Sequence, residues 1–420
     1  MKNEDCCTTT GTDCAAPLAG KRVLVVLGCL DLGGAERQAI QLAEGLLHRH
    51  QATVQVWGFR PPGRAAELCE RLGVPWRYVP EPWGRGLLRW PAMIGNFART
   101  VRRERPEILL PYTAFPNVLC GLAWRLTGAR VCIWNQRDVG LGLASPAVPW
   151  AVRNTPLFLS NSTVGAEYLI ENLRVRTRRV RVVRNAVQLP PPRDDRAAWR
   201  ARLGADPGSL VACMVANLQK NKDHVTLLSA WRIVCDRLGR PDRLSGSDRS
   251  SGGVPTPLAR EAGEGQGVRA LLVLAGRLDA AEPLTQMVRE LRLEPAVRFL
   301  GEVDDVSGLL SAADLGVFSS RSEGCPNGVL ESMAAGLPVV ATDCPGVREA
   351  VGEASLAWLA PAGNPEAMAE RIVLLAEDTA VRARIGQANA LRIQNEFSVE
   401  RRDAEMGALL ASALRDRRWP

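Results

Sequence analysis

Histidine is scarce in this sequence, and its cysteines lack the spacing of a metal site. The chain has three histidines, and none of its eleven cysteines forms a Cys-x-x-Cys pair. Structural zinc sites typically combine such pairs with further cysteines or histidines at set spacings, and disulfide frameworks are typical of small secreted domains, so both are disfavoured. We expect reduced, mostly buried thiols, as in a cytosolic protein.

Long apolar runs are also absent. No stretch approaches the roughly 20 consecutive apolar residues that cross a bilayer. Residues 1–20, MKNEDCCTTTGTDCAAPLAG, lack the apolar centre of a signal peptide, and we expect a disordered tail there. These absences favour a cytoplasmic protein, with peripheral attachment to the inner face of the plasma membrane left open.

What is present is an ordinary globular composition with an excess of arginine. A chain of 420 residues is too long for one core and predicts two or three domains. The net charge of +8 and the pI of about 9.1 favour anionic partners, namely nucleotides, nucleic acid or acidic lipid. A GC-rich genome is an equally good explanation of the arginine content.

Strand-like and helix-like segments alternate along the chain, which predicts βαβ units and parallel sheets. In the first half the expected elements are strands at 22–27, 53–57, 108–110, 130–135, 157–160 and 180–183, and helices at 35–47, 116–126 and 162–173. The linker Leu189–Pro192 precedes a second series. Its expected elements are strands at 210–216, 270–275, 297–300, 315–318 and 338–341, and helices at 224–238, 283–291, 306–312 and from Asn327.

The alternation predicts two doubly wound domains that face each other across a cleft. We place an N-terminal domain at 21–188 and a C-terminal domain at 189–400. Residues 241–267, rich in serine, glycine and charge, are expected to be a disordered insertion. The segment 364–418 is expected to be mainly helical, with a terminal helix at 401–420 that can pack back on the first domain.

The strongest chemical signal is the stretch Ser319–Gly346, SSRSEGCPNGVLESMAAGLPVVATDCPG. It holds Glu323 in a glycine-rich loop and, eight positions later, Glu331 inside a helix that Asn327 can cap. The first N–H groups of a helix suit an anion, and flanking carboxylates suit hydroxyl groups. A nucleotide sugar, with its ribose, diphosphate and hexose, has this layout.

With further segments, this stretch resembles the donor-binding domain of the retaining glycosyltransferases of family 4, which adopt the GT-B fold. The other matching segments are VANLQKNKDH at 215–224, AGR at 275–277, FLGEV at 299–303, AADL at 312–315, GGAER at 33–37, LSNS at 159–162 and VVRNAV at 182–187. The resemblance covers about residue 22 to residue 400. The glutamate pair with its glycines is specific, whereas Gly33 and Gly34 alone are a weak signal.

The resemblance implies a role for each residue of the glutamate stretch. Glu323 contacts the transferred sugar and stabilises positive charge near its reacting carbon, and Glu331 accepts hydrogen bonds from the ribose. The backbone N–H groups expected at the diphosphate belong to Asn327, Gly328, Val329 and Leu330.

The resemblance also assigns residues around the phosphates. Lys222 matches the lysine that neutralises the departing diphosphate, but Asn217 stands where relatives carry an arginine. Lys220 either compensates for that arginine or is solvated, and Arg277 can add charge from the next loop. Gly33 and Gly34 allow close approach of the backbone to a substrate.

One residue usual in the family is missing. Relatives carry a histidine after the strand expected at 130–135, and this chain has Asn135-Gln136-Arg137-Asp138 instead. We therefore assign no catalytic base.

The function that the resemblance implies is metal-independent, retaining transfer of a sugar from a nucleotide sugar to a hydroxyl of a glycan or lipid-linked acceptor. The expected setting is cell-envelope polysaccharide synthesis, and a UDP-sugar is favoured over a GDP-sugar. No cofactor, metal or nucleic acid is expected, and the oligomeric state is open. A nucleotide-sugar epimerase and a non-enzymatic nucleotide binder remain alternatives. A dehydrogenase is disfavoured because the turn Gly28–Gly34 is not G-x-G-x-x-G.

Two arginine-rich segments, 83–105 and 173–184, carry six arginines each. Each is either a solvated face or a patch that docks on an anionic membrane. The solvated face is slightly favoured, because sequence alone cannot establish an apolar face beside the charges.

Overall fold

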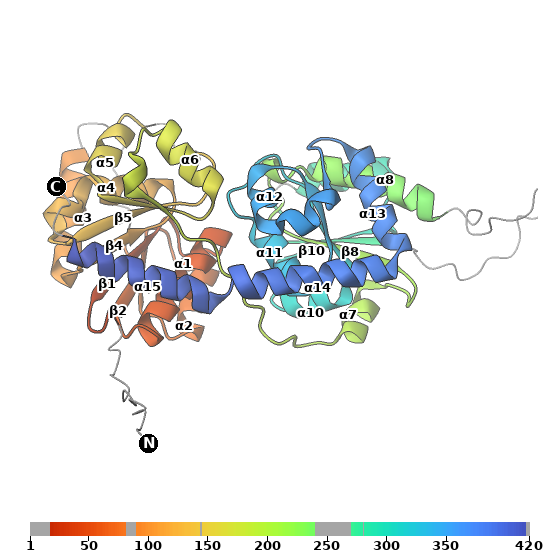
Figure 1. The fold of residues 1–420 in the computed structure, drawn as a ribbon, viewed down its shortest axis with the longest axis horizontal. Coiled ribbons are helices and arrows are strands. Elements are labelled where there is room, and N and C mark those ends of the chain that lie inside the picture. The colour runs from red at the N-terminus through yellow and green to blue at the C-terminus, as the bar shows by residue number, and fades with distance from the viewer. Residues whose placement is uncertain (1–16, 81–89, 143–144, 240–269, 280, 417–420) are drawn as a thin grey trace, which may run out of the picture. The chain divides into compact units, whose positions relative to one another are not determined.

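The computed structural model describes residues 17–80, 90–142, 145–239, 270–279 and 281–416. The insertion expected at 241–267, most of the expected N-terminal tail and the start of the first arginine-rich segment lie outside these residues. The chain divides into two compact units (Figure 1). The first comprises 1–161, 166–183 and 400–420, and the second 162–165 and 184–399.

The first unit is built on a parallel sheet of seven strands in the order β3-β2-β1-β4-β5-β6-β7. The strands are β1 (Arg22–Leu27), β2 (Thr53–Gly58), β3 (Trp76–Tyr78), β4 (Ile108–Pro111), β5 (Val131–Gln136), β6 (Leu157–Ser160) and β7 (Val180–Val182). The order reverses between β1 and β4, which makes this a doubly wound sheet.

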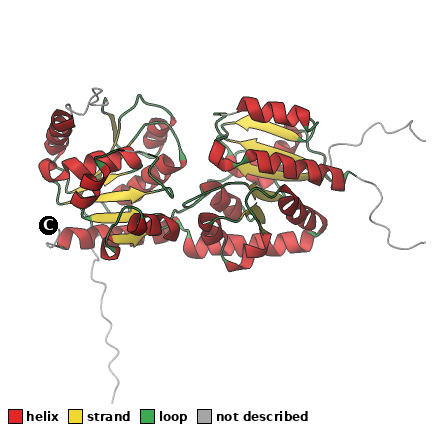
Figure 2. Ribbon diagram, turned by 90° about the horizontal axis from the view of Figure 1, so that it is seen from above, coloured by secondary structure: helices red, strands yellow, loops and turns green. Residues whose placement is uncertain are grey.

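Helices cover both faces of this sheet (Figure 2). They are α1 (Gly34–His48), α2 (Arg64–Arg71), α3 (Trp90–Glu104), α4 (Ala114–Thr127), α5 (Val148–Asn154), α6 (Thr163–Glu171) and α15 (Val399–Arg415), with a short 3-10 turn, η2 (Thr177–Arg179). The sequence analysis missed β3, α2, α3 and α5. In α3 the apolar side chains Met93, Phe97 and Val101 recur every fourth residue and are buried in the core.

The core of the first unit lies on both sides of the sheet because alternate side chains of a strand point to opposite faces. Val25 of β1 packs in the same cluster as Met406 and Leu410 of α15, whereas Val26 packs with Phe97 of α3 in another. Residues of α15 therefore belong to the hydrophobic core of the first unit.

The second unit contains a parallel sheet of six strands in the order β10-β9-β8-β11-β12-β13. Its strands are β8 (Leu210–Val215), β9 (Ala270–Ala275), β10 (Val297–Gly301), β11 (Leu315–Phe318), β12 (Val339–Thr342) and β13 (Leu359–Ala360). The helices are α7 (Arg196–Leu203), α8 (His224–Leu238), α9 (Ala281–Glu290), α10 (Val306–Ala312), α11 (Asn327–Ala334), α12 (Pro345–Val351), α13 (Pro365–Glu377) and α14 (Thr379–Glu396). Two 3-10 turns are η3 (Lys220–Lys222) and η4 (Glu353–Trp358).

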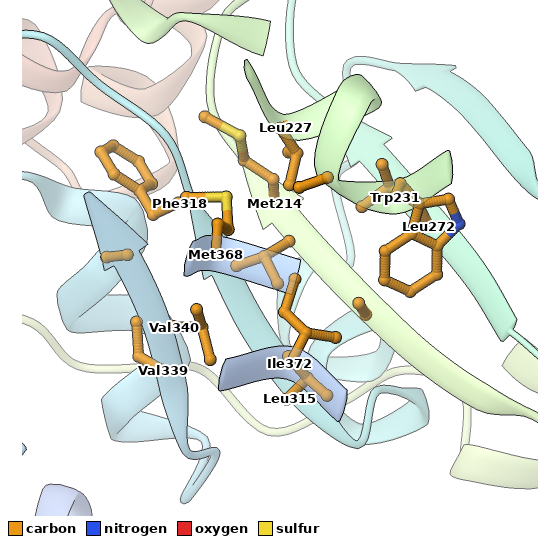
Figure 3. Packing of buried hydrophobic residues seen from close by; sticks show 14 of the residues in the cluster. Met214, Leu227, Trp231, Leu272, Leu315, Phe318, Val339, Val340, Met368 and Ile372 are labelled. Carbon is orange, nitrogen blue, oxygen red and sulfur yellow. The ribbon is translucent and has the colours of Figure 1, made fainter. Parts of the chain in front are cut away.

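Apolar side chains on either side of this second sheet form its core. On one face Met214, Trp231 and Phe318 pack with side chains of α13 (Figure 3). The indole of Trp231 donates a hydrogen bond to the Ala296 carbonyl at 3.0 Å, so its one polar group is satisfied within the core. Cys213 faces the other way and packs against α7 and α10.

Asp305, just before α10, binds the segment that leads into α7. Its carboxylate accepts hydrogen bonds from the Trp199 indole and from the backbone N–H groups of Arg193, Asp194 and Gly308. Burial acts to raise the pKa of Asp305, but these donors outweigh it and hold the pKa at about 2. The stretch that enters α7 is thereby fixed to α10.

Candidate active site

The reversal point of the second sheet brings two candidate loops together. Strands β8 and β11 are neighbours there, although β9 and β10 lie between them in sequence. In open α/β sheets ligands bind outside the carboxyl ends of the strands at such a point. The loop after β8 contains Lys222, and the loop after β11 contains Glu323.

Lys222 and Glu323 form an ion pair across these loops. Nζ of Lys222 lies 2.5 Å from Oε1 of Glu323, and the two side chains are 16% and 10% exposed. The same Nζ lies 5.0 Å from the centre of the Phe318 ring. Oε1 of Glu323 also accepts a hydrogen bond from Ser320 Oγ at 2.6 Å. The lysine and the carboxylate are therefore held in fixed positions at the sheet's carboxyl edge.

The backbone under Glu323 is tied to both neighbouring segments. Ser320 N donates to Thr342 Oγ1 at 2.7 Å, and that hydroxyl donates to Ser320 O at 2.6 Å. Ser319 Oγ donates to Lys222 O at 2.7 Å. Preorganisation of this kind lets a site bind without reorganising its own groups.

The start of α11 differs in detail from the sequence expectation. Pro326 occupies the N-cap position, and Asn327 is the first residue of the helix. Asn327 Oδ1 accepts a hydrogen bond from Asn185 Nδ2 at 2.7 Å, and the same amide donates to Cys325 O at 3.1 Å. The expectation that Asn327 caps the helix is therefore wrong, because Pro326 takes the cap position and Asn327 bonds to Asn185.

The first turn of α11 offers fewer N–H groups to a bound anion than the sequence analysis expected. The Leu330 N–H already donates to Pro326 O at 3.2 Å, so it is committed to the helix. Gly328 and Val329 come before Leu330 in the first turn, where the N–H groups of a helix have no acceptor within the helix. The side chains of Val329 and Leu330 are buried. A Cβ at Gly328 would lie 2.1 Å from Val215 O, so glycine permits the helix start to abut β8.

Glu331 lies on the buried face of α11. Only 7% of this residue is exposed, and its carboxylate acts electrostatically on Cys213 of β8. Burial, and secondarily the Glu331 carboxylate, raise the pKa of Cys213 to about 12. Glu331 is thus a charged group at the same β8 edge that Gly328 abuts.

The loop after β9 supports the loop after β8. The side-chain oxygen of Asn217 accepts a hydrogen bond from the Arg277 N–H at 3.1 Å. Gly276 has a φ of +149°, and a Cβ there would lie 2.2 Å from Ala216 O. Asn217 therefore joins the loops after β8 and β9. The Arg277 guanidinium forms an ion pair with the Asp279 carboxylate at 3.4 Å. Lys220 is exposed and has no carboxylate partner among the described residues.

Gly33 and Gly34 lie at the corresponding reversal point of the first sheet. Gly33 is the N-cap of α1, and Gly34 is its first residue. A Cβ at Gly33 would meet Oε2 of Glu36 at 2.5 Å, so that carboxylate lies over the glycine backbone. Thr113, after β4, has a φ of +68°, which is a strained conformation for a β-branched residue.

Asn135 and Gln136, in the segment where the resemblance led us to expect a histidine, hold the backbone. Asn135 exchanges two hydrogen bonds with Asn117 and donates to Pro111 O at 3.0 Å. The Gln136 amide donates to the carbonyls of Asp138 and Gly140. These two amides are occupied in fixing the loop after β5.

His224 begins α8 beside the lysine loop. Burial, and secondarily the charge of Lys222, lower the pKa of His224 to about 4. Its Nε2 has no hydrogen-bond partner among the residues that the structure describes. In the described ranges no group of three or more His, Cys, Asp and Glu is placed to hold a metal.

Comparisons with known proteins identify the fold and the family of this chain. HepE of Anabaena, in a structure with UDP-glucose, superimposes with a TM-score of 0.75, covering 93% of this chain and 99% of that chain at 21% identity. The fold is that of the GT-B class, with two Rossmann-like domains. Residues 32–189 match the model of Glycosyltransferase Family 4, and residues 195–392 match that of Glycosyl transferases group 1. The two matches together span most of the chain, which therefore belongs to the glycosyltransferases of family 4, also called group 1.

Two curated relatives are similar over part of their length. D-inositol 3-phosphate glycosyltransferase of Streptomyces avermitilis is 29% identical over 236 residues, which are 55% of this chain and 47% of the relative. N,N'-diacetylbacillosaminyl-diphospho-undecaprenol alpha-1,3-N-acetylgalactosaminyltransferase of Campylobacter jejuni is 37% identical over 92 residues, which are 22% of this chain and 24% of the relative. The chain thus spans half or less of the length of these relatives.

Sequence reasoning did not identify three residues that build this site. Ser320 bonds Glu323, Thr342 bonds the backbone of Ser320, and Asn185 joins Cys325 to Asn327. The serine next to the glutamate loop was a usable signal. Thr342 and Asn185 lie in segments that the resemblance had matched, but their bonds join residues 22 and 140 positions apart, and no local pattern predicts those bonds.

Proposed function

We propose that this protein transfers a sugar, with retention of anomeric configuration and without a metal ion, from a UDP-sugar to a hydroxyl of a glycan or lipid-linked acceptor. The observation that carries the proposal is the Lys222–Glu323 pair at the reversal point of the second sheet, beside the start of α11. Family membership supports transfer of a sugar, and the charged groups of the site support the roles given below.

Lys222 is suited to the departing diphosphate. An ammonium group has three N–H donors, and Glu323 accepts one of them at 2.5 Å. The remaining donors can bind phosphate oxygens while the pair with Glu323 persists. The N–H groups of Gly328 and Val329, at the positive end of α11, add to this binding.

Glu323 is suited to the sugar. A carboxylate beside the reacting carbon stabilises the positive charge that develops as the bond to the diphosphate oxygen breaks. The acceptor oxygen then bonds to that carbon on the same face, and its proton passes to the leaving phosphate oxygen. This route requires no enzyme nucleophile, which agrees with the use of Asn135 and Gln136 in fixing backbone.

The donor and the acceptor class rest on similarity. The Anabaena structure contains UDP-glucose, which supports a uridine nucleotide as donor carrier. The Campylobacter relative is named for a diphospho-undecaprenol acceptor, which supports a lipid-linked acceptor. We assign Glu331 to the ribose because it is a buried carboxylate on the helix that starts at the diphosphate position.

The test is an assay of nucleoside diphosphate release from a panel of UDP-sugars and GDP-sugars, with and without lipid-linked and glycan acceptors. We expect acceptor-dependent release of UDP, an α-linked product from an α-linked donor, and unchanged rates after treatment with a chelator. Conversion of the donor alone to another sugar would instead identify an epimerase. Donor binding with neither reaction would leave a non-enzymatic nucleotide binder.

A further inference from the structure

The two oxygens of the Glu323 carboxylate have different surroundings. Oε1 accepts hydrogen bonds from Lys222 Nζ at 2.5 Å and from Ser320 Oγ at 2.6 Å. Among the residues that the structure describes, none donates a hydrogen bond to Oε2. Both donors therefore hold one oxygen and leave the other for a ligand, on a side chain of which 10% is exposed.

The backbone around this carboxylate is fixed independently of it. Thr342 Oγ1 bonds both the N–H and the carbonyl of Ser320. Gly346 of α12 packs so closely that a Cβ there would lie 2.3 Å from Glu323 O. What remains adjustable is the direction of the Glu323 side chain. Within the described part of the chain, its carboxylate has hydrogen bonds from Lys222 and Ser320 alone.

The Ser320 hydroxyl has more acceptors around it than it has protons. Its Oγ lies 2.6 Å from Glu323 Oε1, 2.9 Å from Asn221 O and 3.3 Å from Ser322 O. A hydroxyl donates a single hydrogen bond, and a bond to a charged acceptor is shorter and stronger than one to a neutral acceptor. The proton of Ser320 therefore points to the carboxylate.

Under the proposed function the two donors to Oε1 meet different demands. The Lys222 ammonium is the group assigned to the departing diphosphate, and 16% of its side chain is exposed. A diphosphate is multiply charged and competes with the Glu323 carboxylate for that ammonium. Ser320 is 0% exposed, so the substrate cannot reach its hydroxyl. The bond from Ser320 is thus the one that does not weaken when the donor binds.

We propose that Ser320 is a positioning residue for sugar transfer. Its hydroxyl holds Oε1 of Glu323 in place while Lys222 is engaged by the diphosphate, so that Oε2 meets the transferred sugar. The inference rests on the proposed function and deepens it, because it gives the two carboxylate oxygens separate roles. Oε1 is bound by the protein, and Oε2 is bound by the substrate.

The test separates binding of the nucleotide from turnover. Ser320→Ala removes the hydroxyl and leaves Lys222 in place, so calorimetric titration should give an affinity for UDP within about threefold of the wild type. The kcat for transfer should fall at least about tenfold, because the carboxylate is no longer held. Ser355→Ala deletes an equally buried hydroxyl, bonded to Asn389, and as the matched control it should change neither quantity.

A positioning role depends on Glu323, whereas a merely structural role does not. In the Glu323→Ala background, with residual transfer followed by a radiolabelled donor, adding Ser320→Ala should cost less than about twofold. An undiminished loss in that background would overturn the proposal. Ser320→Cys replaces Ser320→Ala if the latter does not fold, because a thiol is only a weak donor.

Crystal structures of the wild type and of Ser320→Ala, each with UDP, test the inference without turnover. We expect the Glu323 carboxylate to stay in place in the wild type and to rotate in the variant. The same carboxylate position in both structures would overturn the proposal, as would an unchanged kcat or equal losses of kcat and of UDP affinity. A wild type that binds UDP but transfers no sugar would refute the proposed function, and the two structures would still decide the role of Ser320.

Discussion

Lys222 Nζ and Glu323 Oε1 lie 2.5 Å apart, although the two residues are 101 positions apart in sequence. Each partner compensates the other's charge in a site where both side chains are largely buried. The partners come from the loops after β8 and β11, so the ion pair lies at the point where the strand order of the sheet reverses. Its consequences can be measured in several ways.

The ion pair should behave as one unit in catalysis. Lys222→Met and Glu323→Gln should each lower kcat/KM for transfer at least about tenfold, and the double variant should lose less than the product of the two single losses. The coupling follows from the shared hydrogen bond. Glu290→Gln, an exposed carboxylate of α9, is the matched control and should be neutral. Losses that multiply would show that the two residues act independently.

Glycine is required where the loops after β8 and β9 meet. Gly276→Ala would bring a Cβ to 2.2 Å from Ala216 O at a φ of +149°, so we expect the variant to be destabilised by about 2 kcal/mol or more. Gly208→Ala, where nothing lies within 4 Å, is the control and should be tolerated. Urea unfolding of both variants measures the difference, and equal stabilities would refute the close approach.

Asn185 should position the donor site without belonging to the reacting groups. Asn185→Asp would place a carboxylate against the Cys325 carbonyl and Asn327 Oδ1, replacing two hydrogen bonds by repulsion. We expect the KM for the donor to rise at least about fivefold with a smaller change in kcat. Asn172→Asp, an exposed residue, serves as the control. An unchanged donor KM, or a fall in kcat alone, would contradict a positioning role.

His224 should make stability depend on pH. Its pKa is about 4 in the folded protein against an ordinary value of 6.5. As the pH falls from 6.5 towards 4, the His224 ring binds a proton in the unfolded chain but stays neutral in the folded chain. The free energy of unfolding therefore falls in this window, by about 2–3 kcal/mol. Above pH 6.5 the ring is neutral in both states and contributes no slope.

The measurement is urea unfolding across that window. His224→Gln should have a shallower loss of stability than the wild type, because the titrating ring is gone. His48→Gln, at an exposed ring, should retain the wild-type slope. Identical slopes for the wild type and His224→Gln would show that folding does not lower the pKa of His224.

Much of the fold could be predicted because its signals are local. The buried runs of β9 and β11 and the periodic, well-bounded helices α8 and α10 have the bounds that the sequence analysis expected. The segments that were missed are short or masked by charge. In α3 the arginines obscure a buried stripe, and β13 has only two residues, held by pairing with β12.

The candidate site could be predicted in its residue types but not in its connections. Glu323 and Lys222 were found from spacing and resemblance, whereas their contact depends on strand order, which no local pattern encodes. The N-cap of α11 was misassigned because Asn327 has a partner, Asn185, in a distant segment.

The most direct measurement of the central claim is calorimetric titration of UDP into the wild type, Lys222→Ala and Lys220→Ala. If the donor site lies at the reversal point of the second sheet, the wild type binds UDP, Lys222→Ala weakens binding at least about tenfold, and the exposed Lys220→Ala changes it less than about threefold. Failure of the wild type to bind UDP, or equal losses in the two lysine variants, would contradict the account.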